Sequence, residues 1–90
     1  MDKLIAIRQQ INGLNDQLAG LLMQRLHLVQ EVGRIKQQNG LAIKDSQREN
    51  DILNELGAKS SDPATSTYLK DIFQEIMKAS RQAEAEVNKH

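Results

Sequence analysis

The N-terminal part of the chain carries apolar residues at alternating spacings of three and four. This is the heptad pattern of a helix with a single apolar seam. Arg25 interrupts the seam, and Asn39-Gly40 follows it as a left-handed helix stop. The spacing therefore predicts one long helix over about residues 2–39. The seam residues are Leu4, Ile7, Ile11, Leu14, Leu18, Leu21, Leu28, Val32 and Ile35.

A helix of this length does not fit inside a globule made from one such chain. About 37 residues at about 1.5 Å each give a rod of about 55 Å. The chain has 90 residues, and a compact globule of that size is only about 30 to 35 Å across. The remaining residues cannot cover the whole seam. We therefore expect an intertwined homodimer, since a bare two-stranded coiled coil would leave the rest of the chain unexplained.

The middle of the chain predicts a second, shorter helix. An extended link over residues 41–44 leads into Asp45 and Ser46, either of which can cap a helix over about residues 46–56. Ser46 and Glu49 have the spacing of a capping box.

The C-terminal part predicts a third helix. Residues 59–65 are expected to form a polar loop around the only proline, Pro63. Ser66 or Thr67 would then cap a helix over about residues 66–87. The sequence thus predicts an all-α fold with one long and two shorter helices per chain, in a single domain over residues 1–90.

Composition excludes several kinds of chemistry. The chain has no cysteine, so disulfides, thiolate metal sites and a cysteine nucleophile are excluded. Only His27 and His90 could offer imidazole. Twelve basic residues balance twelve acidic ones, so the basic surface of a nucleic-acid-binding protein is missing. Apolar runs are too short for a signal peptide or membrane span. We expect a cytoplasmic protein without metal or cofactor.

Arg25 stands where the seam requires an apolar residue. A guanidinium buried without a partner would cost several kcal/mol, so an anion should meet it. Lys36 lies about 20° further around the helix and about 16 Å along it, and the two side chains could close on one small ligand. A buried ion pair, or a polar residue that sets the register of the helices, would also explain Arg25.

Other charged and polar residues have structural explanations as well. Arg8 lies about 25 Å from Arg25 along the rod; it is either a solvated charge or, in an antiparallel dimer, a neighbour of the partner's site. Arg48 is unexpected in the first helical turn, where a cation opposes the helix dipole. Ser80 interrupts the apolar face of the third helix and Glu84 follows one turn later. Close packing could explain Ser80, and a solvated flank could explain Glu84.

The order of these motifs resembles that of the all-α chorismate mutases. The similarity starts with L-x-x-I-R-x-x-I-x-x-L from Leu4, continues through the block from Arg25 to Lys36, and ends with Asp45-x-x-Arg48-Glu49. It covers about residues 4–88, and its middle block is the most specific part. The resemblance implies an intertwined homodimer that isomerises chorismate to prephenate in phenylalanine and tyrosine biosynthesis.

The resemblance also implies a role for each polar residue. Chorismate is a dianion, and its rearrangement needs a bound conformer and stabilisation of the ether oxygen. By similarity, Arg25 and the partner's Arg8 bind carboxylates, and Lys36 reaches a carboxylate and the ether oxygen. The remaining residues surround the ring: Glu49 and the backbone near Asp45 take its hydroxyl, Arg48 adds positive charge, and Ser80 binds its carboxylate.

Glu84 departs from the common bacterial pattern, which has glutamine at this place, although fungal relatives use glutamate. A carboxylate would repel the negative charge on the ether oxygen, so Glu84 needs a proton to donate a hydrogen bond. The expected catalytic residues are therefore Lys36, Glu84 and Arg25, with turnover improving toward acidic pH.

Two alternatives remain open from the sequence. An isochorismate-pyruvate lyase has a closely similar fold and a related cationic pocket, although the set of Asp45, Arg48 and Glu49 favours the mutase. A non-catalytic helical dimer, such as a regulatory partner of another enzyme, has no reason to place an arginine in a seam.

Overall fold

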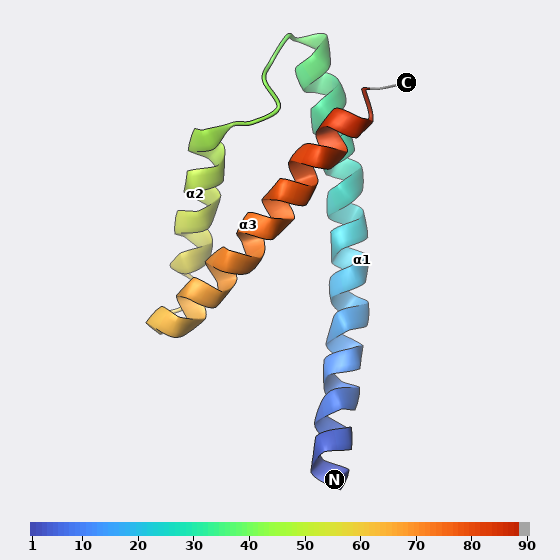
Figure 1. Ribbon diagram of the computed structural model, residues 1–90, viewed down its shortest axis with the longest axis vertical. Coiled ribbons are helices and arrows are strands. Elements are labelled where there is room, and N and C mark those ends of the chain that lie inside the picture. The colour runs from blue at the N-terminus through green and yellow to red at the C-terminus, as the bar shows by residue number, and fades with distance from the viewer. Residues whose placement is uncertain (89–90) are drawn as a thin grey trace.

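The computed structural model describes residues 1–88, and these residues form three α-helices without a strand (Figure 1). They are α1 (Asp2–Gln38), α2 (Ser46–Gly57) and α3 (Pro63–Glu86). The all-α fold expected from the sequence is thereby confirmed.

Helix α1 is the predicted rod. The structure measures 54 Å along its longest axis and has a radius of gyration of 16.4 Å, against about 12 Å for a compact globule of this length. The helix ends as expected: Gly40 has a φ of +65°, and the backbone amide of Leu41 donates to the carbonyl of Lys36 at 2.7 Å. The N-terminal half of α1 extends away from the other two helices (Figure 1).

Helix α2 begins with Asp45 as its N-cap. The Asp45 carboxylate accepts a hydrogen bond from the backbone amide of Arg48 at 3.1 Å. Ser46 is already the first helical residue, so the alternative in which Ser46 caps the helix and forms a box with Glu49 is wrong. This frees the Glu49 side chain for another contact.

Helix α3 begins three residues earlier than the sequence predicted. Asp62 is its N-cap and Pro63 its first residue, where the missing amide hydrogen costs nothing. The predictions of a loop through Thr65 and of a cap at Ser66 or Thr67 are therefore wrong. The Asp62 carboxylate accepts hydrogen bonds from the side-chain hydroxyl and from the backbone amide of Thr65. Both bonds lower the pKa of the Asp62 carboxyl, and the bond from the hydroxyl has the larger effect.

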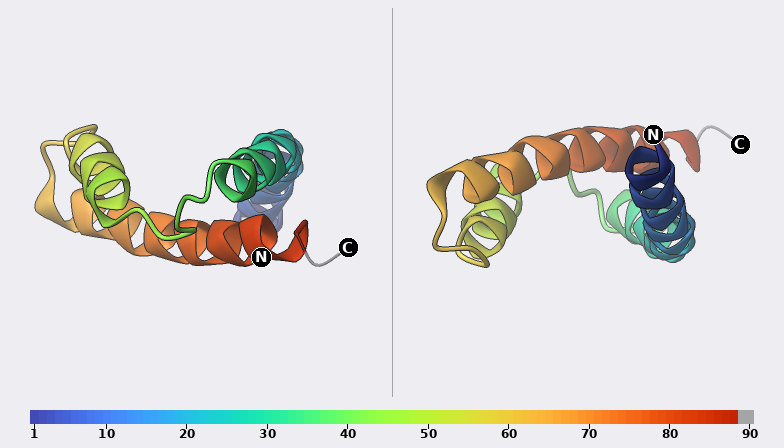
Figure 2. Two further views of the ribbon diagram at one scale, coloured as in Figure 1. Left: turned by 90° about the horizontal axis from the view of Figure 1, so that it is seen from above. Right: turned by 90° about the horizontal axis from the view of Figure 1, so that it is seen from below.

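Helix α3 joins the other two helices. It packs against both α1 and α2, whereas no α-carbon of α1 lies within 8 Å of an α-carbon of α2 in the described residues. Both lie on the same side of α3 (Figure 2). Met77, on α3, is the only large apolar residue among residues 1–88 that is buried, with 4% of its surface exposed.

The apolar seam of α1 is uncovered. Leu18, Leu21 and Leu28 each expose more than half of their surface, and the other seam residues are also exposed. Such a continuous apolar stripe is unusual on the surface of a monomeric protein. The sequence predicts that this seam needs a second chain to cover it.

Candidate active site

A cavity of about 170 Å³ lies where the three helices and the link after α1 approach one another. Its wall contains seven of the eight residues that the sequence singled out. The eighth, Arg8, is exposed on the free half of α1. The seven are Arg25, Lys36, Asp45, Arg48, Glu49, Ser80 and Glu84.

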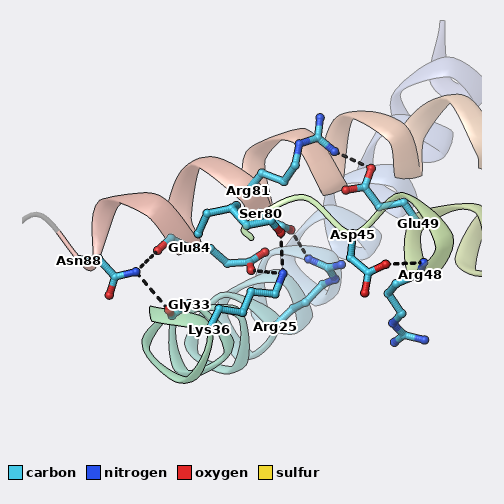
Figure 3. A network of polar contacts seen from close by, with 11 residues as sticks. Arg25, Gly33, Lys36, Asp45, Arg48, Glu49, Ser80, Arg81, Glu84 and Asn88 are labelled. Atoms are coloured by element: carbon cyan, nitrogen blue, oxygen red, sulfur yellow. Dashed lines mark hydrogen bonds and ion pairs between the residues drawn. The ribbon is translucent and has the colours of Figure 1, made fainter. Parts of the chain in front are cut away.

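Arg25 reaches from α1 to α3. Its guanidinium donates a hydrogen bond to the Ser80 hydroxyl (Figure 3). The Ser80 hydroxyl in turn donates to the carbonyl of Ile76 at 2.7 Å. No carboxylate within residues 1–88 pairs with Arg25. The explanation of Arg25 as half of an ion pair is therefore wrong for the described chain. Its charge remains available to an anion in the cavity.

Lys36, on α1, contacts both α3 and the link after α1. Its ammonium lies 2.7 Å from Glu84 Oε1 and donates to the carbonyl of Ile43 at 2.6 Å. The Lys36 and Glu84 side chains are only 17% and 9% exposed, so water screens this ion pair weakly. The contact with Ile43 also ties the link after α1 to the site.

Helices α1 and α3 pack closely at Gly33, next to this ion pair. A β-carbon added to Gly33 would lie 2.6 Å from the carbonyl oxygen of Glu84 and 2.7 Å from its α-carbon. The Asn88 side-chain amide donates to the carbonyls of both Gly33 and Glu84, each at 3.1 Å (Figure 3). Gly33 is therefore required for close packing, and Asn88 holds the end of α3 on α1.

Arg81 is a wall residue that sequence reasoning missed. Its guanidinium lies 2.5 Å from Glu49 Oε1, which joins α3 to α2 (Figure 3). Its position between Ser80 and Glu84 in the sequence is the one feature that could have placed Arg81 near the site. Helical periodicity alone does not show which residue of another helix the Arg81 side chain contacts. Arg48, by contrast, makes no side-chain hydrogen bond or ion pair with the residues described.

The cavity therefore has an excess of cations over anions. Arg25, Lys36, Arg48 and Arg81 face Asp45, Glu49 and Glu84, and two of these carboxylates are already paired. Arginine is suited to bidentate recognition of carboxylates. Within residues 1–88, no group of three acidic or histidine side chains could hold a metal ion.

Two further expectations concern the rest of the chain. No helix among the residues described is long and apolar enough to cross a membrane. The cytoplasmic location stays a prediction. His27 is exposed on α1, and His90 lies outside the described residues.

Fold and cavity together define a small all-helical protein with a cavity whose wall carries more cations than anions. The family model of chorismate mutase type II matches residues 7–85. A solved structure of chorismate mutase (form II) from Thermus thermophilus is similar, with a TM-score of 0.85 and 34% sequence identity over 92% of this chain and 94% of that one. No curated protein matches the chain.

The chain thus belongs to the chorismate mutase type II family, whose members are isomerases by reaction type. The family resemblance inferred from the sequence is confirmed.

Proposed function

We propose that the chain converts chorismate to prephenate in a homodimer whose two sites each need both chains. One observation carries the proposal: Arg25 and Arg48, two cations without a carboxylate partner among the described residues, line one cavity with Lys36. A dianion of the size of chorismate would supply the missing negative charge.

The chemistry requires the protein to hold one conformer and stabilise charge. Within a single molecule, the ether C–O bond breaks as a C–C bond forms, so no net proton transfer is needed. Arg25 would bind one carboxylate and orient it, helped by Ser80, which Arg25 already contacts. Lys36 would donate a hydrogen bond to the ether oxygen as negative charge develops there. Because these donors are held before the substrate binds, little reorganisation accompanies the reaction.

A second copy of the chain would complete the site. The exposed seam of α1 supplies the apolar area for such a dimer. A further cleft of about 590 Å³ between α1 and α3, lined by Leu22, Leu26, Ile72 and Ile76, continues this apolar surface to Arg25. A partner helix in this position would bring its Arg8 to the cavity. This is the cross-chain role expected from the sequence.

Comparison of two substrates tests the proposal against the lyase alternative. The purified chain is expected to convert chorismate to prephenate, and to release little salicylate and pyruvate from isochorismate. The consumption of each substrate and the products can be followed by absorbance and chromatography. The proposal fails if chorismate is not consumed, or if isochorismate is the better substrate.

We also expect turnover to depend on the protonation of Glu84. In its ion pair with Lys36 the Glu84 carboxylate cannot donate a hydrogen bond, and a proton would allow it to donate one to the ether oxygen. The rate of prephenate formation should therefore rise toward acidic pH, and Glu84→Gln should flatten this dependence. The measurement is kcat against pH for both proteins. The same profile for the two would show that Glu84 does not act as this donor.

A further inference from the structure

The ion pair between Arg81 and Glu49 lies in the wall between two cavities. Both residues line the site cavity and a second cavity of about 340 Å³ between α2 and α3. Lys44 and Ser46 border only the second cavity. The Glu49 side chain thus borders a cavity with polar residues on each side. The ion pair with Arg81 determines the position of the Glu49 carboxylate between the two cavities.

We propose that Arg81 is a positioning residue, which holds Glu49 where its second carboxylate oxygen can accept a hydrogen bond from the substrate's ring hydroxyl. This inference rests on the proposed function. Arg81 contacts Oε1 of Glu49 at 2.5 Å. No hydrogen bond from the described residues reaches Oε2, so this oxygen remains available as an acceptor.

Charge gives Arg81 a second effect on the same group. A glutamate in a site for a dianion repels the ligand, and the repulsion is strong where side chains are partly shielded from water. Arg81 and Glu49 expose only 29% and 20% of their side chains. The guanidinium therefore offsets the negative charge of Glu49 and lets a carboxylate take part in binding a dianion.

Arg81→Met tests this role, since methionine keeps much of the side-chain length and removes the charge. We expect KM for chorismate to rise about tenfold with kcat nearly unchanged. A change of about tenfold in KM corresponds to the loss of one hydrogen bond to a charged group. Arg81→Lys should recover part of the loss. Lys78→Met removes a cation from an exposed position of α3, and this control should leave KM unchanged.

A double-mutant cycle separates positioning from a direct attraction between Arg81 and the substrate. In the Glu49→Gln background there is no carboxylate to hold or neutralise, so we expect Arg81→Met to change KM by less than about twofold. Thermal unfolding of each variant shows whether the fold is kept, with Arg81→Lys as the second variant if Arg81→Met unfolds.

The outcomes separate this inference from the proposed function. If the parent chain converts chorismate and Arg81→Met has the parent's KM, the inference is wrong and the function stands. An equal rise in KM in both backgrounds would also overturn the inference, because Arg81 would then act on the substrate directly. A parent chain without turnover would overturn both.

Discussion

Replacing Lys36 by methionine is expected to lower kcat for chorismate by about 100- to 1,000-fold, the usual effect of removing one donor to a developing oxyanion. Methionine fills the space of the lysine stem but cannot donate to the ether oxygen. It also leaves the Glu84 carboxylate, with a side chain only 9% exposed, without its ion-pair partner. The measurement is prephenate formation at saturating chorismate, with circular dichroism to verify the helical fold.

Two further variants separate lost catalysis from lost stability. Arg34→Met removes a cation from an exposed position of α1 two residues earlier, and it should keep the parent's rate. Lys36→Met combined with Glu84→Gln removes the unpaired carboxylate, so it should recover thermal stability without recovering kcat. If Lys36→Met alone retained more than about a third of the parent's kcat, Lys36 would not stabilise the ether oxygen.

Gly33→Ala is expected to weaken both the fold and the site. The new β-carbon would lie 2.6 Å from a backbone oxygen of α3, and backbone cannot rotate away as a side chain can. The two helices must move apart, which costs about 1 to 3 kcal/mol of stability as in other overpacked sites. The same movement separates Lys36 from Glu84, so kcat should fall as well. Thermal unfolding and the chorismate assay measure the two effects.

Gly13→Ala provides the matched control. Within the described residues of one chain, no atom lies within 4 Å of a β-carbon added at Gly13, and alanine favours a helix interior by up to about 1 kcal/mol over glycine. This variant should therefore be at least as stable as the parent. If Gly33→Ala were equally stable and active, the close packing of α1 on α3 would not position the site.

The long helix could be predicted from sequence because its signals are local. The heptad seam, Asp2 and Asn39-Gly40 lie within the segment they define, and α1 runs from Asp2 to Gln38 as a result. The start of α3 was missed although it is also local. The polar composition of residues 59–65 predicts a loop, yet an Asp cap with Pro in the first helical turn is a common helix start.

Contacts across helices could be predicted only in part. The seam position of Arg25 indicated an anionic ligand, and the family resemblance added the other residues of the cavity. Neither indicated that Arg81 pairs with Glu49, which lies 32 residues earlier in the chain. Such a pair depends on how far α2 and α3 are rotated about their axes, and tertiary packing determines this rotation.

The measurement that tests the central claim most directly is prephenate formation by a mixture of two inactive variants. Arg8→Ala and Arg25→Ala should each abolish turnover alone. When the two are unfolded, mixed and refolded, half of the dimers contain one chain of each, and each mixed dimer has one intact site. We predict recovery of about a quarter of the parent's activity.

Recovery is possible only if Arg8 and Arg25 of one site come from different chains. Each variant refolded alone is the control, and size-exclusion chromatography verifies that dimers have formed. A mixture no more active than the two separate variants would contradict a site shared between two chains.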